Sequence, residues 1–155
     1  WEILEQVLHA NQVMPVSNVV FMGMGEPLAN YEAVVEACRF MADPQLFAIA
    51  PSQITVSTVG LVPRILNLAR DLPAVHLALS LHAPNQHLRE QIVPSAKAFP
   101  LHKLMAAVDT HLSTTGNRRM MVEYVLLRGV NDSPATAHEL GQLLKGRNIL
   151  VNLIP

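Results

Sequence analysis

Four apolar runs in this sequence end in short polar segments whose side chains could bind a small charged ligand. Glu26 offers a carboxylate that can pair with an ammonium group, and Gly25 beside it lets the backbone approach a ligand closely. Ser57 and Ser80 offer hydroxyl groups, and His82 offers an imidazole that can donate or accept a hydrogen bond. Together these groups predict a pocket for a polar ligand that carries an amine and a ribose.

Each polar segment also has a simpler explanation when it is taken alone. The segment 23–27 fits a tight turn between a strand and a helix, and its GxG lacks the third glycine of a dinucleotide-binding fingerprint, which disfavours a nicotinamide cofactor. His82 fits a structural hydrogen bond as well as a ligand contact. Ser57 and Ser80 stand outside any GxSxG motif, so serine hydrolase chemistry is disfavoured. Residues 131–132 favour a turn over a catalytic role.

The sequence offers few ligands for a metal ion. Its one cysteine, Cys38, excludes an intrachain disulfide and cannot hold a metal cluster alone. The seven histidines show neither an HExxH motif nor another paired spacing. We therefore expect this chain by itself to bind no metal, and the helical spacing around Cys38 places its thiol in the core.

Apolar runs alternate with segments of helical period, a pattern typical of βα units that build a parallel sheet. We expect helices between the strands, with Ser133 as an N-cap and Pro134 in the first turn of the last helix. Because the carboxyl ends of parallel strands meet at one edge of the sheet, the four polar segments should lie together. The predicted strands are 18–22, 53–57, 75–80, 120–127 and 149–154, and the longest predicted irregular loop is 81–100.

About five parallel strands with covering helices place the chain in the α/β class. Five strands are too few to close an eight-stranded barrel. Two architectures therefore remain possible: a segment of such a barrel, or a doubly wound sheet. The chain begins at Trp1 without a leader, and no helix follows its last predicted strand. We therefore expect it to be part of a longer polypeptide.

Composition narrows the function classes further. Half of the 155 residues are apolar, yet no run approaches the roughly 18 residues that a membrane span needs. The formal net charge is -1, which argues against a surface that binds nucleic acid over its whole extent, so RNA contacts would be local. With a single cysteine and no leader, a cytoplasmic location is the default expectation.

Four motifs, in order along the chain, resemble those of the dual-specificity RNA adenine carbon-2 methyltransferases of the radical S-adenosylmethionine (SAM) superfamily, the RlmN and Cfr group. The similarity covers nearly the whole chain, and the order of four motifs makes it specific. The motifs are FMGMGEPLANY, ITVSTVGLVP, LALSLHAPNQHLREQIVP and VEYVLLRGVNDSPATA.

This resemblance implies a partial (βα)6 TIM-like radical SAM barrel, of which the chain would supply strands two to six. Residues 1–155 would form a single domain, the central to C-terminal part of the barrel. The cluster-binding segment, the N-terminal RNA-binding domain and the C-terminal tail would lie outside it. The SAM-binding residues implied are Gly25 and Glu26 toward the methionine amino group, Ser57 toward the carboxylate or ribose, and Ser80, Leu81 and His82 along the nucleoside.

The resemblance also implies the reaction: a radical SAM methyltransferase that methylates carbon 2 of an adenine in 23S ribosomal RNA, with transfer RNA left open as a second substrate. Family members hold a 4Fe-4S cluster on a CxxxCxxC motif and pass the methyl group through a cysteine near the C-terminus. Cys38 matches neither motif, so the chain would contain no catalytic residue or metal ligand and would be inactive alone.

Other expectations follow from the partial barrel. No membrane contact is expected, and uncovered apolar strand edges should favour self-association of the isolated chain. The alternatives that remain are a radical SAM enzyme of another reaction class and a non-catalytic α/β barrel binding domain.

Overall fold

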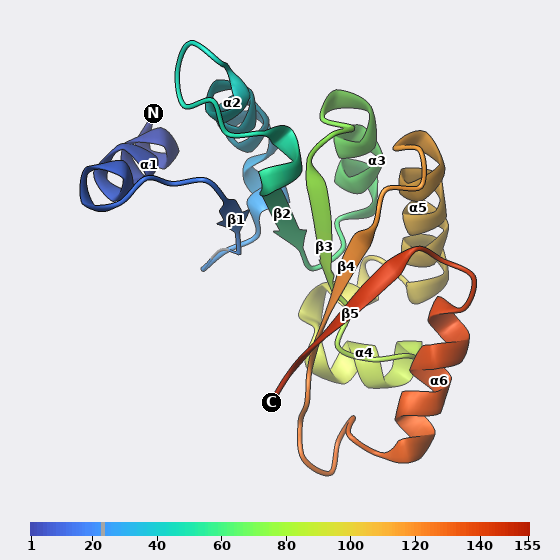
Figure 1. The fold of residues 1–155 in the computed structure, drawn as a ribbon. Helices are drawn as coiled ribbons and strands as arrows, with labels where there is room; N and C mark the ends of the chain where they lie inside the picture. The colour runs from blue at the N-terminus through green and yellow to red at the C-terminus, as the bar shows by residue number, and fades with distance from the viewer. Residues whose placement is uncertain (23) are drawn as a thin grey trace.

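The computed structural model describes residues 1–22 and 24–155 and shows one sheet of five parallel strands (Figure 1). The strands lie in the order β1-β2-β3-β4-β5, so each strand pairs with its neighbours in the sequence. This arrangement confirms the prediction of an α/β fold with five parallel strands. The strands are β1 (Val19–Phe21), β2 (Ile54–Thr58), β3 (His76–Ser80), β4 (Met120–Val125) and β5 (Ile149–Ile154).

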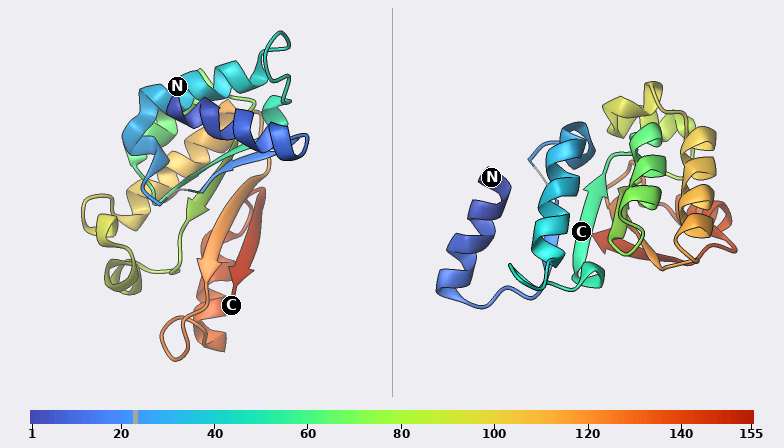
Figure 2. Two further views of the ribbon diagram at one scale, coloured as in Figure 1. Left: turned by 90° about the vertical axis from the view of Figure 1, so that its left-hand side faces the viewer. Right: turned by 90° about the horizontal axis from the view of Figure 1, so that it is seen from above.

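Helices connect the strands, and α2, α3 and α5 cover one face of the sheet (Figure 2). Among the described residues, none of the helices is long and apolar enough to cross a membrane. The helices are α1 (Glu2–Val13), α2 (Tyr31–Ala42), α3 (Val62–Asp71), α4 (Gln86–Ile92), α5 (Leu101–Thr114) and α6 (Pro134–Leu144), with short 3-10 turns η1 (Pro27–Asn30), η2 (Pro51–Gln53) and η3 (Pro94–Lys97).

Successive side chains along each strand point to opposite faces of the sheet, as the pleat of a strand requires. In β4, Met120, Val122 and Tyr124 are 0–2% exposed and belong to the hydrophobic core beneath the helices. Met121 and Glu123 point to the opposite face. That second face is left without covering helices in the described part of the chain (Figure 2), as in one segment of an open barrel.

The predicted helix start at Ser133 is confirmed. The Ser133 hydroxyl accepts a hydrogen bond from the Thr136 amide at 3.1 Å, and Pro134 occupies the first turn, where a missing amide N–H costs nothing. Cys38 is 1% exposed in α2, which confirms its place in the core.

The prediction of an irregular loop over 81–100 is wrong. This stretch contains α4 and η3, and the Asn85 side chain caps α4 by accepting a hydrogen bond from the Leu88 amide at 3.0 Å. The helix escaped detection because the residue it buries is an arginine, Arg89, rather than an apolar side chain. A search for apolar periodicity cannot find a short helix of this kind.

One buried histidine gives the fold a pH dependence. His111 in α5 is 3% exposed, and its Nδ1 has no hydrogen-bond partner among the described residues. Burial lowers the pKa of His111, opposed in part by a hydrogen bond to the backbone of Ile65. The folded chain therefore holds this imidazole neutral at a pH where the unfolded chain already binds a proton.

We expect the free energy of unfolding to decrease as pH falls through about 6.5, the ordinary histidine pKa, and toward the lower folded pKa. His111→Phe should flatten this dependence by removing one proton-binding group, worth at most about 1.4 kcal/mol per pH unit. Urea unfolding of the full-length protein between pH 5 and 8 measures how the free energy of unfolding changes with pH. His102→Phe, on the exposed side of α5, is the matched control. An unchanged slope in His111→Phe would contradict this account.

Candidate binding site at the carboxyl edge of the sheet

The residues predicted to bind a ligand all lie at the carboxyl edge of the strands. Gly25 and Glu26 follow β1, Ser57 lies near the end of β2, and Ser80 ends β3. Gly23, which belongs to the predicted segment 23–27, lies outside the described residues. The parallel pairing of β1, β2 and β3 places these strand ends side by side.

Glu26 joins the turns after β1 and β2. Its Oε1 accepts a hydrogen bond from the Leu28 amide at 2.9 Å, and its Oε2 accepts one from the Val59 amide at 2.7 Å. The carboxylate is thus oriented by backbone donors on both oxygens. Each oxygen has a second lone pair, so Glu26 can still accept a hydrogen bond from an ammonium group.

A row of polar side chains crosses the face of the sheet that the helices leave open. Ser80 pairs with Glu123 and Glu123 with Asn152 in the strand register, so the three side chains lie at one level. Asn152 donates to Glu123 Oε2 at 2.7 Å, and Glu123 is only 3% exposed. Sequence reasoning missed Glu123, although a charged residue within the apolar run VEYV was a visible signal.

His82 presents one ring nitrogen as a hydrogen-bond donor. Its Nδ1 accepts from the Val125 amide at 3.1 Å, so the ring proton of the neutral form must be on Nε2. Burial lowers the pKa of His82, the Arg89 guanidinium lowers it further, and the Glu123 carboxylate opposes both. At neutral pH the ring is therefore uncharged and can donate from Nε2.

Leu81 belongs to the framework of this edge. Its side chain is 0% exposed, its amide donates to the Glu123 carbonyl at 3.1 Å, and its carbonyl accepts from Arg89 Nε at 3.2 Å. These two hydrogen bonds fix the backbone of Leu81 and therefore the positions of its neighbours Ser80 and His82. A direct contact between Leu81 and a ligand stays a prediction.

Asn131 links the turn after β3 to the end of β4. Asn131 ends a turn over 128–131, which agrees with the turn predicted at this point, and its side chain is 2% exposed. Its Nδ2 donates to the carbonyls of His82 at 2.8 Å and Val125 at 2.7 Å, and its Oδ1 accepts from the Leu127 amide at 2.7 Å. The turn that contains His82 is thereby tied to the end of β4.

The described residues offer no protein ligands for a metal cluster. Within 1–22 and 24–155, no group of three or more His, Cys, Asp or Glu side chains could hold a metal ion. Burial raises the pKa of the Cys38 thiol to about 12, so this side chain stays protonated in the core. The polar groups of the carboxyl edge could hydrogen-bond amine, hydroxyl and base groups of a ligand, and the described residues do not fit an iron–sulfur cluster.

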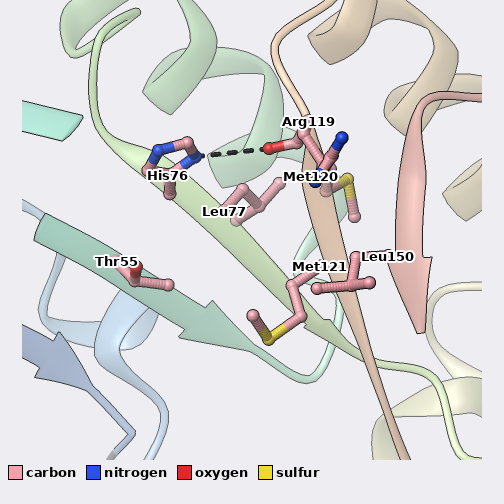
Figure 3. A pocket seen from close by; sticks show the side chains of 7 residues that line it. All are labelled: Thr55, His76, Leu77, Arg119, Met120, Met121 and Leu150. Atoms are coloured by element: carbon pink, nitrogen blue, oxygen red, sulfur yellow. Dashed lines mark hydrogen bonds between the residues drawn. The ribbon is translucent and has the colours of Figure 1, made fainter. Parts of the chain in front are cut away.

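A hollow lies at the opposite, amino edge of the strands (Figure 3). Its volume is about 160 Å³, and its lining includes Thr55, Met121 and Leu150. The His76 Nδ1 lies 3.2 Å from the Arg119 carbonyl at its rim. The residues predicted to bind a ligand lie outside this hollow.

Comparison with known proteins identifies relatives of this chain. The family model described as the radical SAM superfamily matches residues 2–140. The "Probable dual-specificity RNA methyltransferase RlmN 2" of Protochlamydia amoebophila (strain UWE25) is 48% identical over 99% of this chain and 44% of its own length. The chain therefore spans less than half the length of this curated relative.

Solved structures agree with this relationship. A radical SAM methyltransferase from Sphaerobacter thermophilus matches 99% of this chain and 45% of its own, with a TM-score of 0.91 and 45% sequence identity. A domain of pyruvate-formate lyase-activating enzyme from Bacteroides vulgatus ATCC 8482 matches 90% of this chain and 81% of its own, with a TM-score of 0.66. At 16% identity, the second similarity shows the fold alone.

Asn131→Ala should destabilise the protein by about 3 kcal/mol, because three part-buried backbone groups lose their partner at about 1 kcal/mol each. Thermal and urea unfolding of the full-length protein measure the change. Asn30→Ala is the matched control, since Asn30 stands at the N-cap of α2 and its side chain makes no cap hydrogen bond. Equal stability of the two variants would show that the Asn131 hydrogen bonds do not hold this edge.

Proposed function

Because the chain belongs to the radical SAM superfamily, we propose that its carboxyl-edge site binds SAM within an enzyme that methylates carbon 2 of an adenine in RNA. Similarity to a curated RlmN relative at 48% identity over 99% of the chain carries this proposal. The solved relative with a TM-score of 0.91 is likewise a radical SAM methyltransferase. Bound SAM supplies the methyl group and, when reduced, an adenosyl radical.

The chemistry of the edge suits the parts of SAM. The oriented Glu26 carboxylate suits the methionine amino group, and Gly25 beside it lets the backbone approach. The Ser57 hydroxyl suits the carboxylate or the ribose. Ser80 and the Nε2 donor of His82 suit the nucleoside, with Leu81 holding the peptide between them. These side chains bind and orient the ligand, and none of them carries out the methyl transfer.

Polypeptide outside residues 1–155 is proposed to hold the 4Fe-4S cluster and the methyl-accepting cysteine. The sequence contains Cys38 alone, and that thiol is buried and protonated. We assign the chain to the central and C-terminal part of the barrel, strands two to six, as a single domain. An RNA-binding region would likewise come from other parts of the enzyme, consistent with the net charge of -1 here.

The proposed substrate is 23S ribosomal RNA, with transfer RNA as the second RNA to be tested, and the proposed location is the cytoplasm. The full-length protein, reconstituted with its cluster and given SAM and a reductant, should convert one adenine of a 23S RNA transcript to 2-methyladenine. Mass spectrometry of the digested RNA detects the product. Cleavage of SAM without RNA methylation would instead indicate a radical SAM enzyme of another reaction class.

Glu26→Ala should weaken SAM binding by about ten- to hundred-fold, since a charge-assisted hydrogen bond contributes roughly 1.5–3 kcal/mol. Isothermal titration calorimetry on the full-length protein measures the affinity. Glu32→Ala is the matched control, because Glu32 is an exposed carboxylate whose partner is Arg64 at 3.1 Å. An affinity for SAM in Glu26→Ala equal to that of the control would exclude this role.

A further inference from the structure

Arg89 is a buried charge without a carboxylate partner. It is 0% exposed and has the largest of the fully buried side chains described. The salt bridges found in residues 1–22 and 24–155 join other arginines to carboxylates, and Arg89 takes part in none of them. A buried guanidinium is costly unless it is well hydrogen-bonded, so its partners matter.

The partners of Arg89 are carbonyl groups of the two turns that bear the candidate site. Nη2 donates to the Val59 carbonyl at 2.6 Å and, more weakly, to the Ser80 carbonyl at 3.5 Å. Nε donates to the Leu81 carbonyl at 3.2 Å. Carbonyl dipoles thus take the place of a counter-ion, and one side chain links the end of β2 to the end of β3.

The Val59 peptide is held from both sides. The Glu26 carboxylate accepts a hydrogen bond from the Val59 amide at 2.7 Å, and the Arg89 guanidinium donates one to the Val59 carbonyl at 2.6 Å. Gly60 follows with φ +104°, and a Cβ there would lie 3.0 Å from Leu104 and 3.4 Å from Arg89 Nη2. The turn therefore requires glycine next to the guanidinium.

We propose that Arg89 is a positioning residue for SAM binding: its guanidinium fixes the turns 59–60 and 80–82 in the arrangement that presents Ser80 and His82 to the ligand. The SAM part of this inference rests on the proposed function. Arg89 does not touch the ligand in this role, because its side chain is fully buried.

The charge of Arg89 has a second consequence, at His82. Burial lowers the pKa of Arg89 to about 10, which leaves the guanidinium positive at neutral pH. Its charge lowers the pKa of His82, in addition to burial and against the Glu123 carboxylate. The charge therefore favours the neutral ring, whose Nδ1 accepts from the Val125 amide and whose Nε2 carries the proton.

The test compares Arg89→Met and Arg89→Lys with Arg118→Met, an exposed arginine at the amino edge, all in the full-length protein. SAM affinity is measured by calorimetry, and the titration of His82 by NMR of 15N-labelled histidine, assigned with His82→Gln. Arg89→Met should weaken SAM binding about ten- to hundred-fold and raise the pKa of His82. Arg89→Lys should keep the His82 titration near that of the unmodified protein while still weakening SAM binding, because an ammonium cannot reproduce the planar fork.

A folded Arg89→Met protein that binds SAM as the control does and titrates His82 unchanged would overturn the proposal. If Arg89→Met does not fold, Arg89→Lys decides it. Arg89→Lys must then bind SAM more weakly than Arg118→Met does, and equal affinities of these two variants overturn the proposal. Absence of SAM binding in the unmodified protein would count against the proposed function, while the His82 titration would still test the role of the Arg89 charge.

Discussion

Hydrogen bonds between backbone groups and the side chains of Glu26, Arg89 and Asn131 hold together the turns that follow the parallel strands. Turns beyond a strand end lose the partners of the sheet ladder, and buried amides and carbonyls need others. Glu26 satisfies the Val59 amide, Arg89 satisfies the Val59 and Leu81 carbonyls, and Asn131 satisfies the His82 carbonyl. These bonds join the ends of β1, β2, β3 and β4, where the candidate site lies.

The fold was largely predictable from the sequence, and the framework of the site was not. Apolar runs placed all five strands to within a few residues, and the cap at Ser133 was visible from its type and the proline after it. Helix α4 was missed because its buried residue is Arg89. Pairings such as Asn131 with His82 join residues far apart in sequence, which neither periodicity nor turn chemistry reveals.

The two faces of the sheet differ in chemistry: one packs in the hydrophobic core, and the other bears the polar residues of the candidate site. The helix-covered face is apolar and holds Cys38, whose thiol is protonated and plays no part in the site. The open face has polar side chains at Ser57, Ser80 and Glu123, arranged near the carboxyl edge. Glu123 is a carboxylate that the sequence analysis did not single out, and its side chain is buried on this face, where it accepts a hydrogen bond from Asn152.

A crystal structure of the full-length protein with SAM bound tests the central claim most directly. The account predicts the amino group of SAM within hydrogen-bond distance of the Glu26 carboxylate, and the adenosyl group along Ser80 and His82. SAM found at the amino-edge hollow beside Thr55 and Met121, or on the helical face, would contradict it.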